Sequence, residues 1–340
     1  VHNTRGLNAV IVQPTAPTEP RNRTPTDEHR TARTSGFGRP VLNPRIEIDP
    51  ARGATMWTQH HDLHSHSLHS DGEHPVEMVA ELMHAEGVQT WSLTDHDTAS
   101  GWLEAATAAA QFGIRFVPGV EITCEPALAF DEAHLARIGR ERASASWHLL
   151  AYFPDHKPGT EDEQTDAFKA WLAPRQNDRL PRMEAMCRRL EALGMPVDIE
   201  TVCAKASGSV GRPHLAERMV ELGYVSSKLE AFETWIGDGL PAFVPHTKPS
   251  VEEAVRVVHA AGGVTSLAHP LYYGVPTEAL IERLAHLGVD AVEAVHRSHS
   301  DAYRHELTEA ATRHGLAVSV GSDFHGLSWQ ARPGNMPVRT

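Results

Sequence analysis

The sequence predicts a mixed α/β protein, a closed or nearly closed barrel of strands and helices that carries an inserted all-helical subdomain. From Trp57 onward, apolar strand-like runs alternate with segments of helical periodicity. Polar residues gather at the ends of these runs, which is where α/β barrels carry their active sites. The alternation stops between about Pro158 and Pro245, where the periodicity is helical only.

Seven short apolar runs bounded by turn residues are predicted to be strands. They are DLHSHS, VQTWSLTD, IRFVPGVEIT, SWHLLAYF, VTSLAHP, VDAVEAV and LAVSVGSDF. Helical spacing of apolar residues predicts helices over 75–86, 99–112, 251–261, 278–286 and 303–313. Strands that alternate with helices favour a parallel sheet.

The ends of two predicted helices have identifiable signals. Pro75 suits the first position of a helix, because its missing N–H would have no partner there. Ser250 and Glu253 have the spacing of a capping box, and Gly262 closes the segment that they begin.

Length and composition exclude several classes of protein. The 340 residues suffice for about two domains. Hydrophobic residues make up 41%, and no apolar run approaches the roughly 18 residues of a membrane span, so an integral membrane protein is excluded. The net charge of −13 disfavours duplex DNA and anionic membranes as partners, so a phosphorylated ligand must be held by a local site. Three scattered cysteines favour reduced thiols and a cytoplasmic location.

The domain boundaries follow from changes in composition. Residues 1–55 are rich in Pro, Thr and Arg and lack apolar periodicity, so we expect a disordered tail. Residues 56–157 and 246–340 are predicted to form the barrel, and residues 158–245 the helical insertion.

Histidine is the unusual component, with 23 residues, and neutral imidazole is the commonest metal ligand. Two pairs of residues at strand ends have the i, i+2 spacing that places both side chains on one face of a strand. They are His64 with His66 and Asp323 with His325. Further candidates lie at or beside strand ends. These are Asp71, His96, Glu121, His148 and His269.

Each of these residues alone would have an ordinary explanation, such as a turn histidine or a solvated carboxylate. Their joint occurrence favours a metal centre, because the same groups without a metal would be buried with mutual repulsion or without partners. Nine candidates exceed the four ligands of one tetrahedral site, so we expect two or three divalent ions with Glu121 as a bridge. Mixed imidazole and carboxylate ligands suit Mn, Zn or Fe. Such ions generate hydroxide at neutral pH and neutralise phosphoryl oxygens, which is hydrolase chemistry.

The motifs HSHSLHSDG, TDHDT, PGVE, AHP and GSDFH resemble those of the polymerase and histidinol phosphatase (PHP) superfamily. The resemblance runs from about Asp62 to His325 and implies a distorted (β/α)7 barrel with a trinuclear phosphoesterase centre, with manganese the most expected metal. It implies a metal-bridging hydroxide at His64, His66, Glu121 and Asp323. A second ion would take Glu121, His148 and His269, and a third Asp71, His96 and His325.

The helical insertion and the stretches SGSVGRPHLAERMVELG and PAFVPHTKPSVEEAV resemble one branch of this superfamily. That branch contains nucleotide phosphatases and 5′-to-3′ exoribonuclease-like enzymes, which implies 3′,5′-adenosine bisphosphate, AMP or short 5′-phosphorylated RNA as substrate. Residues 125–146 are longer than is usual in the branch, which affects the expected pocket rim and substrate size.

Candidates for holding the substrate are Arg212 and His214, which begin a helix whose free amides could bind a phosphate. Arg212 could equally pack between insertion and barrel. Arg175 and Arg179 could line the cleft or be surface charges, and His246 and His299 match positions in the branch.

The sequence therefore predicts a cytoplasmic, metal-dependent phosphoric ester hydrolase that acts on nucleotides or short RNA. The first alternative is a histidinol-phosphate phosphatase, which would share the metals. The second, of another class, is a non-catalytic module that binds metal or nucleotide.

Overall fold

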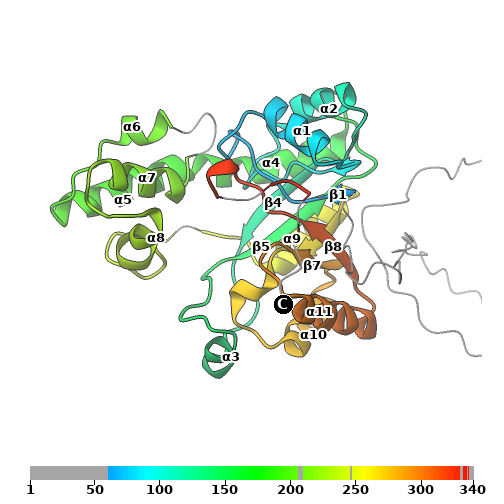
Figure 1. Cartoon of the computed structure of the whole chain (residues 1–340). Helices are drawn as coiled ribbons and strands as arrows, with labels where there is room; N and C mark the ends of the chain where they lie inside the picture. Colours follow the sequence, from blue (N-terminus) through cyan, green and yellow to red (C-terminus); the bar gives the residue numbers. More distant parts are fainter. Residues whose placement is uncertain (1–59, 206–209, 246, 330–331, 335, 337–340) are drawn as a thin grey trace, which may run out of the picture.

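The computed structural model describes residues 60–205, 210–245, 247–329, 332–334 and 336. The predicted tail at residues 1–55 and the candidate His246 lie outside these residues. Within them the chain has a mixed α/β fold, as predicted, with helices on both sides of the strands (Figure 1).

The strands form two sheets. The first has the order β1-β2-β3 and is parallel throughout. The second has the order β4-β5-β6-β7-β8, and β5 runs antiparallel to both of its neighbours. The prediction of a parallel sheet is therefore wrong for β5, and right for the pairs β6–β7 and β7–β8. The bounds are β1 His61–Asp62, β2 Thr90–Trp91, β3 Arg115–Phe116, β4 Gly119–Cys124, β5 Trp147–Tyr152, β6 Val264–Leu267, β7 Ala291–His296 and β8 Ala317–Gly321.

The two sheets meet through isolated contacts. Ser65 bridges to Phe324 and His96 bridges to Glu121, both in parallel orientation. The backbone N–H of Leu63 also donates to the carbonyl of Val320, at 3.0 Å. The sheet ladders of the described residues therefore do not form a closed barrel, and the bridges bring the strand ends of both sheets together.

Helices cover both sheets, and their starts follow the sequence signals. Pro75 is the N-cap of α1, one position before the expected place. The Ser250 hydroxyl accepts from the Glu253 N–H at 3.1 Å, but the Glu253 carboxylate turns to Trp171, so the expected capping box is only half formed. The helices outside the insertion are α1 Val76–Ala85, α2 Trp102–Gln111, α3 Glu132–Arg137, α9 Val251–Ala260, α10 Thr277–Leu287 and α11 Asp301–His314.

The main core lies between the second sheet and its helices. Val120, Ile122 and Leu149 from the strands pack there with Val255 and Leu280 from the helices. Each such side chain contributes roughly 1.5–3 kcal/mol by its burial. This rigid core holds the ends of β4 to β8 in fixed positions.

Between β5 and β6 the described elements are mostly helical, and α5 to α8 lie together to one side of the sheets (Figure 1). The helices are α4 Glu163–Asn177, α5 Arg179–Ala192, α6 Ile199–Cys203, α7 Arg212–Glu221 and α8 Lys228–Ala231, followed by the π-helical turn η1 Phe232–Ile236. Met186, Leu190 and Leu215 belong to a separate core here, whereas Phe168 and Leu172 of α4 pack into the main core. None of the helices in the described ranges has the length and apolar character that crossing a membrane requires.

Candidate metal centre

The candidate ligands converge where the two sheets meet. His64 and His66 directly follow β1, Glu121 lies within β4, and Asp323 follows β8. His148 is near the start of β5, opposite Thr123. Because β5 is antiparallel to β4, its start lies at the same edge as the end of β4. The reversed strand therefore brings its histidine to the common site.

The backbone at the site is strained. Asp97, His269 and Asp323 are the non-glycine residues with positive φ in the described part of the chain, at 52°, 28° and 52°. Such conformations cost about 1–3 kcal/mol each and persist only where the surroundings enforce them. Two of the three are candidate ligands and the third follows the candidate His96. The fold thus maintains unfavourable backbone geometry in order to aim these side chains.

The first cluster consists of His64, His66, Glu121 and Asp323. The Nε2 atoms of His64 and His66 lie 3.2 and 3.1 Å from the same carboxylate oxygen, Oε2 of Glu121. They also lie 3.4 and 3.3 Å from Oδ1 of Asp323. Both imidazoles are fully buried. The two imidazoles and two carboxylates therefore face one small volume.

The other oxygen of Glu121 serves a second group. Oε1 lies 2.8 Å from Nδ1 of His148 and 3.0 Å from Nε2 of His269. The side chains implied by the resemblance for a second ion are therefore in contact with Glu121. His96 also approaches, with Nδ1 3.1 Å from Oε2 of Glu121. Glu121 thus has the geometry of a bridging carboxylate.

The third group contains Asp71, His96 and His325, together with His66. Asp71 lies 3.7 Å from His96 Nε2 and 3.4 Å from His325 Nε2. The His66 and His325 rings stack with centroids 4.1 Å apart. All nine residues expected from the sequence to be ligands are thus brought together.

The atoms that face one another fit metal ions. Buried polar atoms are almost always hydrogen-bonded. At this site several are not bonded within the described residues, and all belong to the candidate ligands or to His296 beside them. They are His64 Nε2, His66 Nε2, Asp71 Oδ1, His96 Nδ1, Glu121 Oε2 and His296 Nε2. Imidazole nitrogens and carboxylate oxygens aimed at one another form a donor set for two or more divalent cations.

The electrostatics of the cluster also call for cations. Burial alone would raise the pKa of Glu121, but His96, His64 and His148 hold it well below its usual range. Burial alone would lower the pKa of His66, but the nearby carboxylates of Asp323 and Glu121 raise it to about 10. By contrast, burial lowers the pKa of His96 to about 3, which leaves a neutral ring. The carboxylates are ionised and attract positive charge into the site.

Several supporting residues were missed in the sequence. Oε1 of Glu293 lies 2.9 Å from Nδ1 of His64, and its Oε2 accepts from the His269 N–H at 2.7 Å. Glu293 is fully buried in β7, and a carboxylate within the apolar run VDAVEAV was a signal that could have revealed it. His296 and Arg297, at 3.6 and 3.5 Å from Asp323 Oδ2, carried no comparable signal.

The candidates for substrate contact divide into those beside the candidate metal ligands and those engaged by other residues. Arg179 of α5 pairs with Asp97 at 2.5 Å, next to His96. The buried His214 accepts from the Gly211 N–H at 3.0 Å, and a side-chain atom added at Gly211 would lie 3.8 Å from Cβ of Asp71. The start of α7 therefore borders the third group of ligands.

The remaining arginines have other surroundings. Arg212 is 3.3 Å from Asp238 and lies over the rings of Phe232 and Phe243. Arg175 lies over Trp171 at 3.7 Å and pairs with Glu253. His299 is fully buried, and its Nδ1 is 3.0 Å from the Ala294 carbonyl.

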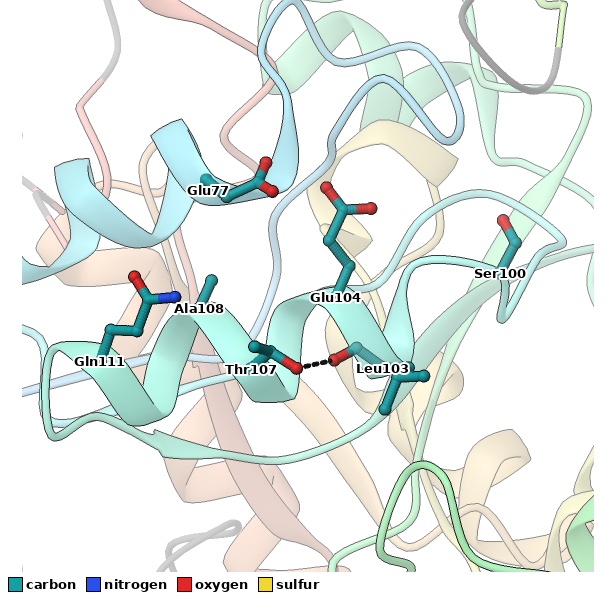
Figure 2. Close-up of a pocket in the computed structure, with 7 residues that line it drawn as sticks. All are labelled: Glu77, Ser100, Leu103, Glu104, Thr107, Ala108 and Gln111. Atoms are coloured by element: carbon teal, nitrogen blue, oxygen red, sulfur yellow. Dashed lines mark hydrogen bonds between the residues drawn. The ribbon is translucent and has the colours of Figure 1, made fainter.

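Figure 2 shows a pocket of about 360 Å³ that is separate from the ligand cluster. It lies along α2, with Glu77 of α1 on the opposite wall, and the Thr107 hydroxyl within it donates to the Leu103 carbonyl. Its lining residues are Glu77, Ser100, Leu103, Glu104, Thr107, Ala108 and Gln111. None of the nine candidate ligands lines this pocket.

Comparisons with known proteins agree with the geometry. The model of the PHP domain matches residues 62–171. The chain is 33% identical to a 5′-3′ exoribonuclease of Haemophilus influenzae, over 79% of this chain and 90% of the relative. It is 32% identical to a 3′,5′-nucleoside bisphosphate phosphatase of Chromobacterium violaceum, over 78% of this chain and 86% of the relative.

A solved structure of a metal-dependent phosphoesterase from Bifidobacterium adolescentis is also similar. It has a TM-score of 0.62 and 30% identity, and covers 78% of this chain and 87% of that one. These likenesses favour a hydrolase over a non-catalytic module. From the convergent ligands and these relatives, the chain belongs to the PHP family and is a metal-dependent phosphoesterase.

Proposed function

We propose that this enzyme hydrolyses phosphate esters of nucleotides, either 3′,5′-nucleoside bisphosphates or short 5′-phosphorylated RNA. The observation that carries the proposal is the cluster of orphaned nitrogen and oxygen atoms around Glu121, with Arg179 paired to Asp97 and Arg297 paired to Asp323 at its border. The named relatives act on such substrates. In a protein of net charge −13, these two arginines provide the local attraction that a phosphorylated substrate needs.

We assign His64, His66, Glu121 and Asp323 to one ion, with Glu121 shared. His148 and His269 complete the second set around Glu121, and Asp71, His96 and His325 the third. Held by these residues, divalent ions would supply an activated water as nucleophile and positive charge to neutralise phosphoryl oxygens. The mixed histidine and carboxylate ligands suit Mn, Zn or Fe alike. Manganese is our first choice because of the resemblance to the PHP superfamily.

The protein's own residues orient this donor set. Glu293 lies against Nδ1 of His64, so with a cation bound Nδ1–H would donate to the carboxylate and Nε2 would present its lone pair to the cluster. Arg297 and His296 lie beside Oδ2 of Asp323, which leaves its Oδ1 toward His64 and His66. Burial of these side chains excludes bulk water and strengthens their interaction with charge on the substrate.

The helices inserted between β5 and β6 would hold the rest of the substrate. We propose that residues 158–245 are a subdomain that faces the metal centre, with the barrel-like unit formed by 56–157 and 246–340. Arg182 supports this role, because it is half-buried, near Arg179 and Arg212, and burial lowers its pKa to about 10. Such crowded positive charge favours a phosphate or polyphosphate ligand.

The test is phosphate and nucleotide release, with added manganese, from four substrates in parallel. They are 3′,5′-adenosine bisphosphate, AMP, a 5′-phosphorylated oligoribonucleotide and histidinol phosphate. We expect hydrolysis of the bisphosphate or the oligoribonucleotide, and loss of turnover in His64→Ala. Activity on histidinol phosphate alone would replace our proposal with that phosphatase. Turnover unchanged in His64→Ala would refute the metal assignment.

A further inference from the structure

A polar network on the outer side of the cluster connects two ligand-bearing loops. His69 lies in the loop between the candidate ligands His66 and Asp71. Its Nδ1 is 2.9 Å from Oγ of Ser100, and its Nε2 is 2.9 Å from Oε2 of Glu104. Ser100 lies two residues before α2 and Glu104 lies in its first turn, and α2 follows the loop of His96. The imidazole therefore spans from one loop to the other.

The hydrogen bonds of this network have one consistent direction. The Thr98 hydroxyl donates to Oγ of Ser100 at 3.0 Å. The Ser100 hydroxyl can then donate to Nδ1 of His69, and the Nε2–H donates to the Glu104 carboxylate. With Nδ1 of His69 as acceptor and Nε2–H as donor, every member of this network has a hydrogen-bond partner. Thr98 is two residues beyond His96, which ties the network to that ligand.

Glycines leave room for the imidazole and the tight loop. A Cβ at Gly101 would lie 2.9 Å from Cδ2 of His69 and 2.8 Å from Leu93. A Cβ at Gly72 would lie 2.6 Å from the carbonyl carbon of His66. All three distances are shorter than a carbon atom tolerates, so the ring and the loop fit because these two positions lack side chains.

A separate set of hydrogen bonds, to Asp95, holds the inner side of the loop that carries His69. The buried Asp95 accepts from the backbone N–H and the hydroxyl of Ser67, both at 2.8 Å, and from the Ser70 hydroxyl at 2.6 Å. Asp95 fixes the base of the loop next to His66. His69 is the side chain that connects the outer part of the loop, near Asp71, to α2.

We propose that His69 is a positioning residue, which sets the metal affinity of the subsite formed by Asp71, His96 and His325. This rests on the ligand assignment of the proposed function. Asp71 and His96 lie on different loops with 3.7 Å between their ligand atoms, so relative movement of the loops changes the subsite directly. Groups that orient ligands typically contribute about 10- to 100-fold in metal affinity.

The experiment measures metal content and Mn²⁺ affinity of the full chain by competition with a chelator. It compares the wild type with His69→Ala, His69→Gln and Thr107→Val. We expect the His69→Ala protein to bind its most weakly held Mn²⁺ ion about 10- to 100-fold less tightly than the wild type. The affinities for the other Mn²⁺ ions should be unchanged. Glutamine can accept from Ser100 and donate to Glu104, so His69→Gln restores most of the affinity. Thr107→Val, in the neighbouring pocket, leaves it unchanged.

A steric variant keeps the test decisive if His69→Ala fails to fold. Gly101→Ala removes no polar group but displaces the His69 ring, and we expect the same selective loss. Equal affinities in the wild type, Gly101→Ala and every folded His69 variant would overturn the proposal, as would a wild type that binds no metal. Selective loss of one equivalent in a protein that hydrolyses no nucleotide would support this role and refute only the proposed substrate.

Discussion

Oε1 of Glu293 lies 2.9 Å from Nδ1 of His64, and both side chains are fully buried in the protein. This contact orients the His64 ring, because the carboxylate can accept a hydrogen bond from Nδ1–H. The other nitrogen, Nε2, points toward Glu121 and Asp323, and it would present its lone pair to a cation bound between them. The orientation of a candidate metal ligand that follows β1 is thus determined by a residue of β7, in the other sheet.

Replacing Glu293 should therefore weaken metal binding. We expect Glu293→Ala to lower the affinity for Mn²⁺ by about 10- to 100-fold, because His64 loses its orienting partner. Glu293→Gln should lose less, since its amide oxygen still accepts one of the two hydrogen bonds. Titration calorimetry checks both variants. Wild-type affinity in Glu293→Ala would show that packing alone orients His64.

Glu121 should be indispensable for turnover, since it contacts five histidines through its two oxygens. An amide in its place has one acceptor oxygen and cannot serve both groups. We expect Glu121→Gln to reduce kcat at least about 100-fold, because several kcal/mol of charge stabilisation are lost. Steady-state kinetics with saturating metal measures this. A fall in KM alone, at unchanged kcat, would contradict a bridging role.

Metal should stabilise the folded protein. Ions that bind the native state alone at 100 times Kd add about 2.7 kcal/mol. Because 1 kcal/mol shifts the Tm of a domain of roughly 150–250 residues by about 2–4 °C, we expect the Tm of this larger chain to rise by several degrees. Scanning calorimetry with manganese and with a chelator tests this, and His64→Ala is the control with a smaller shift. An identical Tm under both conditions would argue against tight binding.

The two cores should respond to substitution separately. Phe168→Ala removes a ring from the main core and should cost about 3–5 kcal/mol, whereas Met186→Ala should cost about 2–5 kcal/mol in the helical region. Hydrogen exchange should rise in β4 and β5 for the first and in α5 and α7 for the second. Increased exchange of β4 in Met186→Ala would show that the helical region and the sheet unfold together.

The two arginines Arg175 and Arg212 should differ in kinetics. Arg175 is engaged by Trp171 and Glu253, so Arg175→Ala should leave KM for nucleotides unchanged and lower stability by at most about 1 kcal/mol. Arg212→Ala should raise KM several-fold with little change in kcat, if Arg212 binds substrate. An unchanged KM would restrict Arg212 to packing against Phe232 and Phe243.

Much of the site could be predicted because its residues mark strand ends. His64, His66 and Asp323 have the period-two spacing of strands, and the structure brings them together. The direction of β5 was misjudged although the sequence held a hint. His148 lies near the beginning of its strand, whereas His64, His66, His269 and Asp323 follow theirs, and an antiparallel strand is the arrangement that reconciles the two.

Other features depend on contacts between distant segments. Nothing near Arg175 in the sequence shows that Trp171 and Glu253 engage it, since Glu253 is on another helix. Likewise, the helical region looked uniform, yet Phe168 of α4 belongs to the main core. Periodicity identifies a buried face but does not show which surface covers it.

The pairing of Tyr152 with Val264 has a consequence for how such enzymes diversify. These two residues are the last of β5 and the first of β6, so the long intervening chain leaves and re-enters the sheet at adjacent positions. A tight turn would suffice to join antiparallel neighbours. Since α4 and α9 pack against the sheet, the stretch between them can be lengthened, shortened or exchanged without redirecting a strand. New substrate preferences could thus arise by replacing one connection while the catalytic scaffold stays intact.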